Sequence, residues 1–177
     1  WTFKIKRFQK LLYFPLYEGR YVKYASSIRA VSHLEKSNLI KLFPKSKVTM
    51  IPNCVSVPIL HNERPLDQTI KVLFMGRLNP VKNVDMLVKA WHKSSLNKNM
   101  ELTIAGPDEN VIDKFNDLVC GNIKYVGPQY GPEKERLLQT SHYFILPSSN
   151  EGMPSSIIEA MSYGIIPIFT DACNLSE

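Results

Sequence analysis

From residue 70 onward, short apolar runs alternate with segments whose apolar residues recur every three or four positions. The run Ile70–Met75, closed by Gly76, predicts a buried strand, and the i, i+3, i+4, i+7 spacing over residues 84–91 predicts an amphipathic helix. The same patterns predict strands at Glu101–Ala105, Ile123–Val126, Tyr143–Leu146 and Ile165–Phe169, and helices at Val111–Val119, Pro132–Gln139 and Ser155–Tyr163. Alternation of helices with nearly continuous apolar strands predicts an α/β fold, a parallel sheet with helices on both faces.

The first sixty residues follow a different pattern. They predict a helix over residues 3–24 that is broken near Pro15, strands over 27–31 and 48–51, and a helix over 33–42 between these strands. Two strands cannot bury both faces of a sheet by themselves. We therefore predict that residues 1–56 are the end of a preceding domain, 57–69 a linker, and 70–177 a Rossmann-like domain that is truncated at its C-terminus.

The composition, 44% apolar and 21% charged over 177 residues, is typical of a soluble globular protein. No apolar run approaches the roughly 18 residues of a membrane span. We predict no signal peptide, and because the first residue is Trp1 rather than Met we expect a fragment. The three scattered cysteines predict reduced thiols in the cytoplasm. The histidine spacing and the absence of a D-x-D pair predict no metal site.

The net charge of +6 is concentrated near the N-terminus, where residues 1–50 contain 11 Lys and Arg against Glu18 and Glu35. Aromatic side chains lie among these charges, a pattern that suits the surface of an anionic membrane. It also suits nucleic acid, but charge alone supports that reading, and we predict no nucleic-acid partner. A solvated helix packed on a neighbouring domain explains the pattern at least as well.

Two carboxylates, Glu151 and Glu159, bracket a turn and the start of a predicted helix. Pro154 stands at the expected first helical position, where a missing N–H costs nothing. The free N–H groups of this turn can converge on an anion, helped by the helix dipole; they belong to Gly152, Met153, Ser155 and Ser156. Ordinary helix capping accounts for the same residue types.

A second loop, Gly76–Asn83, follows the first predicted strand and carries Arg77 and Lys82. Arg binds phosphate through two parallel hydrogen bonds, whereas Lys is a mobile point charge. In a parallel sheet, ligands bind at the loops that follow the strands, so both loops lie where this architecture places its chemistry. Two cations and a helix N-terminus can hold a diphosphate without a metal, although loop cations are more often simply solvated.

Several short sequence segments resemble the nucleotide-sugar-binding C-terminal domain of the family 4 retaining glycosyltransferases, which have the GT-B fold. They follow one another in the same order as in that family and lie at the ends of predicted strands. These segments are Val72–Asn83, Leu102–Gly106, Ile123–Gly127, Leu146–Pro154, Ile158–Met161 with Gly164, and Pro167–Asp171. Upstream, Ala30–Ser32 and Val48–Asn53 resemble the end of the acceptor-side domain. The chain departs from the family at Asn53–Ser56, where Asn-Gly-Val-Asp is usual, and after Asp171, where glycines are usual.

The resemblance implies a role for each candidate site residue. Arg77 and Lys82 would neutralise the donor diphosphate and Glu151 would face the donor sugar, so these three are the implied catalytic residues. Glu159 would accept hydrogen bonds from the ribose hydroxyls. The other implied donor-binding positions are Gly76, Val126, Gly152, Met153, Pro154, Ser155 and Ser156.

The function that the resemblance implies is transfer of a hexose from a UDP- or GDP-linked donor to a saccharide or lipid-linked acceptor. It implies retention of configuration, no metal and no cofactor, and a role in polysaccharide biosynthesis in the cytoplasm or on the inner face of the cytoplasmic membrane. We expect the fragment alone to have little or no transfer activity, because most of the acceptor-side domain lies outside it. Two alternatives stay open, a nucleotide-sugar epimerase of the same architecture and a non-catalytic nucleotide-binding module.

Overall fold

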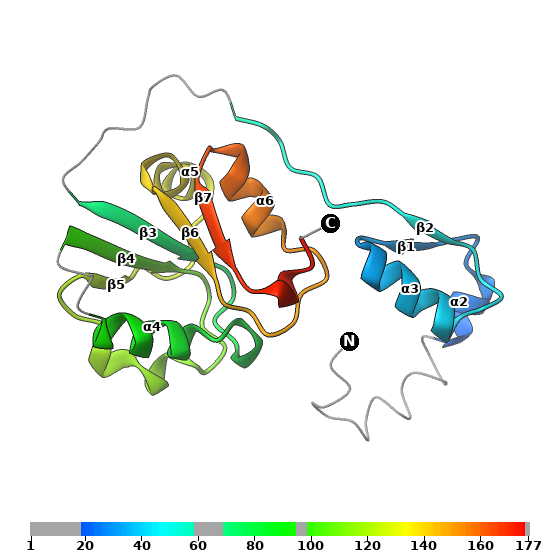
Figure 1. Ribbon diagram of the computed structural model, residues 1–177, viewed down its shortest axis with the longest axis horizontal. Coiled ribbons are helices and arrows are strands. Elements are labelled where there is room, and N and C mark those ends of the chain that lie inside the picture. Colours follow the sequence, from blue (N-terminus) through cyan, green and yellow to red (C-terminus); the bar gives the residue numbers. More distant parts are fainter. Residues whose placement is uncertain (1–18, 59–68, 95–98, 176–177) are drawn as a thin grey trace. The chain divides into compact units, whose positions relative to one another are not determined.

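A computed structural model of the chain describes residues 19–58, 69–94 and 99–175. These residues form two compact units, one containing the described residues up to Asn53 and the other running from Cys54 to Cys173 (Figure 1). Most of the predicted linker, 57–69, lies outside the described residues, as does the part of the predicted helix 3–24 that precedes residue 19.

The N-terminal unit is a pair of parallel strands with a helix between them in sequence. Its elements are α2 (Gly19–Tyr24), β1 (Ile28–Ala30), α3 (His33–Leu42) and β2 (Val48–Met50), which confirms the strand–helix–strand prediction. The start of α3 is capped in both directions: the hydroxyl of Ser32 accepts the N–H of Glu35 at 3.2 Å, and the Glu35 carboxylate accepts the N–H of Val31 at 2.7 Å.

The second unit is built on a parallel sheet of five strands. These are β3 (Ile70–Met75), β4 (Met100–Ala105), β5 (Ile123–Tyr125), β6 (Tyr143–Leu146) and β7 (Ile166–Phe169). They lie in the order β5-β4-β3-β6-β7, and all neighbouring pairs are parallel. The last four residues of both β3 and β4 are buried, as expected for strands covered on both faces. The predicted α/β fold with a parallel sheet is confirmed.

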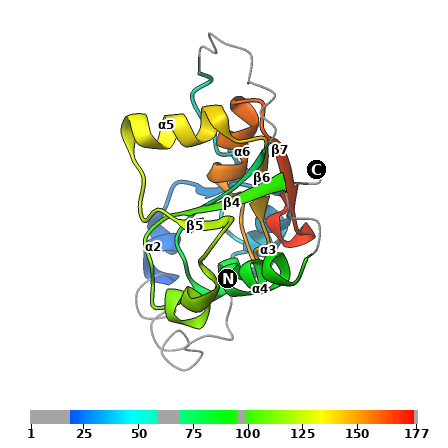
Figure 2. The ribbon, with the colours of Figure 1, turned by 90° about the vertical axis from the view of Figure 1, so that its left-hand side faces the viewer.

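Helices cover both faces of this sheet (Figures 1 and 2). One face carries α4 (Val84–Lys93), and the other carries α5 (Gly131–Thr140) and α6 (Ser155–Ser162). The core between the layers contains completely buried side chains from strands and helices, among them Leu73, Phe74, Val88, Ile104, Phe144 and Ile157.

The helix predicted over residues 111–119 is wrong, because the segment forms two short 3-10 turns, η4 (Ile112–Lys114) and η5 (Asn116–Leu118). The Asp108 carboxylate accepts the first two N–H groups of the segment, at 2.9 and 3.0 Å, and the backbone then continues in 3-10 hydrogen bonds such as that from the N–H of Lys114 to the carbonyl of Val111 at 3.1 Å. Phe115 interrupts the segment with φ −146°. Val111 and Phe115 are nevertheless buried, and their i, i+4 spacing is what imitated a helical face.

The direction in which strands are added reverses beside β3. The chain proceeds outward from β3 to β4 and β5, and then returns to place β6 and β7 on the other side of β3. In open α/β sheets, ligands bind outside the carboxyl ends of the strands at such a reversal. The loops at this point are residues 76–83, after β3, and 147–154, after β6, which are the two loops that carry the predicted charged residues.

Candidate functional site

Hydrogen bonds fasten the loops after β3 and β6 to each other. The side-chain amide of Asn83 donates to the carbonyl of Pro147 at 2.9 Å, and the N–H of Ser149 donates to the carbonyl of Val81 at 2.8 Å. Asn83 adopts a left-handed conformation with φ 52°, which asparagine tolerates better than most residues. The two loops therefore form one joined surface at the strand reversal.

Lys82 and Glu151 meet on this surface although 69 positions separate them in sequence. The Lys82 Nζ lies 2.6 Å from a Glu151 carboxylate oxygen, and the two side chains are only 15% and 14% exposed. Lys82 ends the short turn η2 (Pro80–Lys82), which the Asn79 side chain caps. The N–H of Glu151 donates to the carbonyl of Ala172 at 2.9 Å. Two predicted catalytic residues thus form a nearly buried ion pair, and hydrogen bonds hold the backbone of each residue in place.

Cys173 is completely buried next to this ion pair, in the turn η6 (Asp171–Cys173). Burial raises the pKa of its thiol; the hydrogen bond with Thr170 and the Lys82 ammonium oppose that rise, and the Glu151 carboxylate adds to it. The thiol is therefore protonated at neutral pH and acts as a small core side chain.

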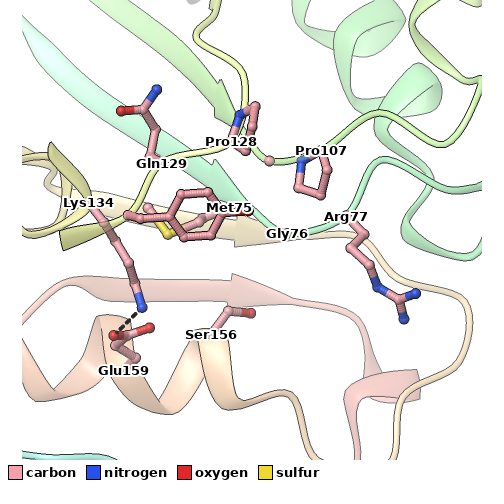
Figure 3. A pocket seen from close by; sticks show the side chains of 11 residues that line it. Met75, Gly76, Arg77, Pro107, Pro128, Gln129, Lys134, Ser156 and Glu159 are labelled. Atoms are coloured by element: carbon pink, nitrogen blue, oxygen red, sulfur yellow. Dashed lines mark ion pairs between the residues drawn. The ribbon is translucent and has the colours of Figure 1, made fainter.

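A cavity of about 420 Å³ opens at the carboxyl ends of the strands (Figure 3). Its lining residues come from the loops after β3, β4 and β5 and from α5 and α6; they are Met75, Gly76, Arg77, Gly106, Pro107, Pro128, Gln129, Tyr130, Lys134, Ser156 and Glu159. Four of them, Gly76, Arg77, Ser156 and Glu159, are predicted site residues. Ser156 lies in the first turn of α6, whose N–H groups have no intrahelical partner.

Close approach of two loops forms the floor of this cavity. Gly106 has φ 144°, and a Cβ atom placed on it would lie 1.8 Å from the carbonyl oxygen of Gly76, so only glycine fits there. The hydroxyl of Tyr125 donates to the Gly106 carbonyl at 2.9 Å. Burial, and secondarily the Asp108 carboxylate, raise the pKa of Tyr125, so this donor keeps its proton.

The two predicted cations are held differently. Arg77 forms an exposed ion pair with Glu109 at 3.1 Å, its side chain 67% exposed, and can reorient toward a ligand at little cost. Lys82 does not line the cavity, but its Cε lies 3.9 Å from the position that a Cβ on Gly76 would occupy. The Lys82–Glu151 pair therefore adjoins the cavity wall at Gly76.

The remaining predicted donor-binding residues are not among those that line this cavity. Val126 follows β5, and its N–H donates to the carbonyl of Ile104 at 3.0 Å. Pro154 is buried and occupies the N-cap position of α6 with φ −72°, so the prediction that it is the first helical residue is wrong by one position. The others, Gly152, Met153 and Ser155, lie in the loop before α6 and at its first residue.

Sequence reasoning missed Lys134, whose Nζ lies 2.6 Å from a Glu159 carboxylate oxygen (Figure 3). It also missed the apolar and amide lining residues from the loops after β4 and β5, although those loops were expected at the ligand site. One signal was available: Lys134 stands in the first turn of α5, where the helix dipole disfavours a cation.

A second cavity, of about 630 Å³, also has Glu159 in its lining. It is lined by Val55, Ser56, Pro58, Glu135, Gln139, Glu159 and Tyr163. Burial raises the pKa of Tyr163, and the Glu135 and Glu159 carboxylates add to the rise. The side chain of Glu159 thus contributes to the walls of both cavities.

Within residues 19–58, 69–94 and 99–175, no three or more His, Cys, Asp or Glu side chains are grouped so that they could hold a metal ion. In the same part of the chain, no helix is both long enough and apolar enough to cross a membrane.

The fold is that of the GT-B glycosyltransferases. The structure is similar to that of the lipopolysaccharide outer core galactosyltransferase WaaB, with a TM-score of 0.65 and 25% identity over 84% of this chain and 44% of that one. It is also similar to HepE of Anabaena, solved with UDP-glucose, with a TM-score of 0.74 and 16% identity over 91% and 49% of the two chains.

The family model described as glycosyl transferases group 1 matches residues 58–177, and the chain belongs to this family. Among curated proteins it is 29% identical to the capsular polysaccharide biosynthesis glycosyltransferase CapH of Staphylococcus aureus, over 87% of this chain and 45% of that protein. It is 28% identical to a putative teichuronic acid biosynthesis glycosyltransferase, TuaC of Bacillus subtilis, over 64% and 27%. The chain spans less than half the length of the curated relatives it matches.

Proposed function

We propose that this chain supplies the donor site of a glycosyltransferase that uses a UDP- or GDP-linked hexose. The observation that carries the proposal is the Lys82–Glu151 pair at the strand reversal, beside a cavity that Glu159 and the first turn of α6 help to line. Proteins of the same fold have been solved in complex with UDP or UDP-glucose, among them TarM of Staphylococcus aureus and HepE of Anabaena.

In the proposed complex, the nucleoside lies in the 420 Å³ cavity with its ribose hydroxyls on Glu159. The diphosphate lies across Gly76, within reach of Arg77, Lys82 and the N–H groups that begin α6. The nearby Val126 and the backbone of residues 152–156 complete the donor site. Glycine at position 76 leaves room for the phosphates to approach the backbone.

Cleavage of the bond between the sugar and the diphosphate builds negative charge on the leaving group and positive charge on the sugar ring. Arg77, Lys82 and the positive end of α6 stabilise the leaving diphosphate. Glu151 orients the sugar hydroxyls and favours the cationic ring. Because Lys82 is already held by Glu151, its ammonium needs little reorganisation when the diphosphate binds.

The finer assignments belong to the same proposal. We infer family 4 membership, retention of configuration and metal-independent transfer without a cofactor, because the two loop cations and the helix N-terminus supply the positive charge that a metal would otherwise bring. We also propose a saccharide or lipid-linked acceptor and a place in polysaccharide assembly in the cytoplasm or at the cytoplasmic membrane. The names of the relatives CapH and TuaC support that place.

Calorimetric titration with UDP, GDP, ADP and their hexose conjugates tests the proposal. We expect saturable binding of UDP or GDP, weakened at least about tenfold by Lys82→Met, since a hydrogen bond to a charged group contributes about 1.5–3 kcal/mol. Lys89→Met is the matched control, because its 3.5 Å pair with Asp85 lies along α4 and away from the cavity. Equal binding by both variants, or no binding by a chain shown to be folded by circular dichroism, would contradict the proposal. Epimerised nucleotide sugar, formed without an acceptor, would favour the epimerase alternative.

A further inference from the structure

Lys134 reaches across the gap between two helices to bind Glu159. It extends from the first turn of α5, and its Nζ lies 2.6 Å from the carboxylate of Glu159 on α6 (Figure 3). A cation in the first turn of a helix is unfavourable for that helix, because the N-terminal end of the dipole is positive. The position of Lys134 is thus explained by its partner rather than by α5 itself.

The burial of this pair sets it apart from an ordinary surface ion pair. The side chains of Lys134 and Glu159 are 32% and 27% exposed; in the equally short pair of Lys124 with Glu101 the carboxylate side chain is also 27% exposed, but the lysine is 55% exposed. A less exposed pair keeps a more definite geometry, because water competes less for both partners. Lys134 therefore restricts where the Glu159 carboxylate can point.

The side chain of Glu159 can point into either of two cavities. Its side chain helps to line both the 420 Å³ cavity and the 630 Å³ cavity, and Lys134 lines only the first. Glu135 lines the second cavity, so a carboxylate that turned that way would approach another negative charge. Attraction from Lys134 and repulsion from Glu135 both favour the first cavity for Glu159.

We propose that Lys134 is a positioning residue that aims the Glu159 carboxylate at the ribose of the bound nucleotide. This inference rests on the proposed function, in which Glu159 accepts the ribose hydroxyls. The two oxygens of a carboxylate offer about four acceptor sites, so Glu159 can bind the Lys134 ammonium and a diol together. Lys134 contributes to ribose recognition without touching the ribose.

Discrimination between ribose and 2′-deoxyribose measures this role directly. The diphosphate that binds most tightly among UDP, GDP and ADP is titrated alongside its 2′-deoxy form, for the unaltered chain and its variants. The unaltered chain should prefer the ribonucleotide about tenfold, the value of one hydrogen bond to a charged group. Lys134→Met and Lys134→Gln should each reduce that preference at least about threefold, and Glu159→Gln should nearly abolish it.

Two variants separate positioning from simple structural support. Lys134→Arg keeps the cation and should restore the preference to within about twofold of the unaltered chain, since Arg also pairs with carboxylates. Lys124→Met removes an ion pair of the same 2.6 Å length outside the cavity and should leave the preference unchanged. Melting temperatures are recorded for every variant, so that any loss of fold is seen.

The possible outcomes are distinct. An unchanged preference in Lys134→Met with a lowered melting temperature would show that Lys134 only tethers α5 to α6, and would overturn the inference. Equal weakening of both nucleotides would show direct contact between Lys134 and the nucleotide, and would also overturn it. If the unaltered chain binds the ribonucleotide and its 2′-deoxy form equally well, Glu159 does not recognise the ribose, although the proposed nucleotide binding stands. If the unaltered chain binds no nucleotide, the proposed function itself is wrong.

Discussion

Replacing Glu151 by Gln removes one charge of the Lys82–Glu151 pair and keeps the size of the side chain. Opposite charges 2.6 Å apart attract by about 6 kcal/mol at an effective dielectric constant of about 20, before the cost of desolvation is subtracted. Loss of one partner costs about 3–5 kcal/mol in a fully buried pair and at most about 1 kcal/mol in an exposed one. With both side chains about 15% exposed, we expect a loss of about 2 kcal/mol of unfolding free energy.

A loss of this size lowers the melting temperature by about 4–8 °C for a domain of this length. Thermal unfolding followed by circular dichroism measures the change, and urea denaturation gives the free energy independently. Lys124→Met is the matched control: it breaks a pair of the same 2.6 Å length whose Lys is 55% exposed, so we expect a drop of only about 1–2 °C.

The double variant Lys82→Met/Glu151→Gln completes the test. It removes both charges and leaves neither partner unpaired, so it should recover at least about half of the loss caused by Glu151→Gln alone. A melting temperature that Glu151→Gln leaves unchanged, or a double variant whose loss is the sum of two single losses, would refute the view that these residues form a buried, coupled pair.

Three further predictions concern the surroundings of the site. Gly106→Ala should lower the unfolding free energy, measured by urea denaturation, by about 3 kcal/mol or more, because the new Cβ would overlap the Gly76 carbonyl. Gly121 has φ 60° and open space around it, so Gly121→Ala should lower the unfolding free energy by only about 1 kcal/mol. Equal losses in the two variants would contradict this reasoning. Iodoacetamide at pH 8 should alkylate the two exposed cysteines and spare Cys173 until the chain unfolds, whereas early labelling of Cys173 would contradict its burial. Because burial raises the pKa of the Cys173 thiol, its contribution to stability is complete below about pH 8.5 and is lost as pH rises through the raised value. Unfolding free energy should therefore fall more steeply above pH 9 in the unaltered chain than in Cys173→Ala, and parallel profiles would contradict this.

The elements of the sheet were predictable because the strands are short and largely apolar, and β3, β4 and β6 are followed directly by Gly or Pro. The segment 111–119 shows the limit of that approach. Its apolar spacing fits a helix, but the backbone forms 3-10 hydrogen bonds such as that from the N–H of Lys114 to the carbonyl of Val111, and the hydrophobic pattern does not distinguish the two.

The charged residues of the site were also visible in the sequence, whereas their pairing was not. Arg77, Lys82 and Glu151 stand in loops, and Glu159 in the helix that follows one of them, which the α/β pattern places at one edge of the sheet. That Lys82 pairs with Glu151 depends on the side-by-side position of β3 and β6, which only the tertiary structure determines. Lys134 belongs to a helix whose sequence alone gives no indication of which partner it reaches.

A crystal structure of the chain with its tightest-binding nucleoside diphosphate tests the central claim most directly. The account predicts the diphosphate between Arg77, Lys82 and the start of α6, with the ribose hydroxyls on the Glu159 carboxylate and the base in the 420 Å³ cavity. A nucleotide bound in the cavity beside Tyr163, or one whose phosphates face away from Lys82, would contradict it.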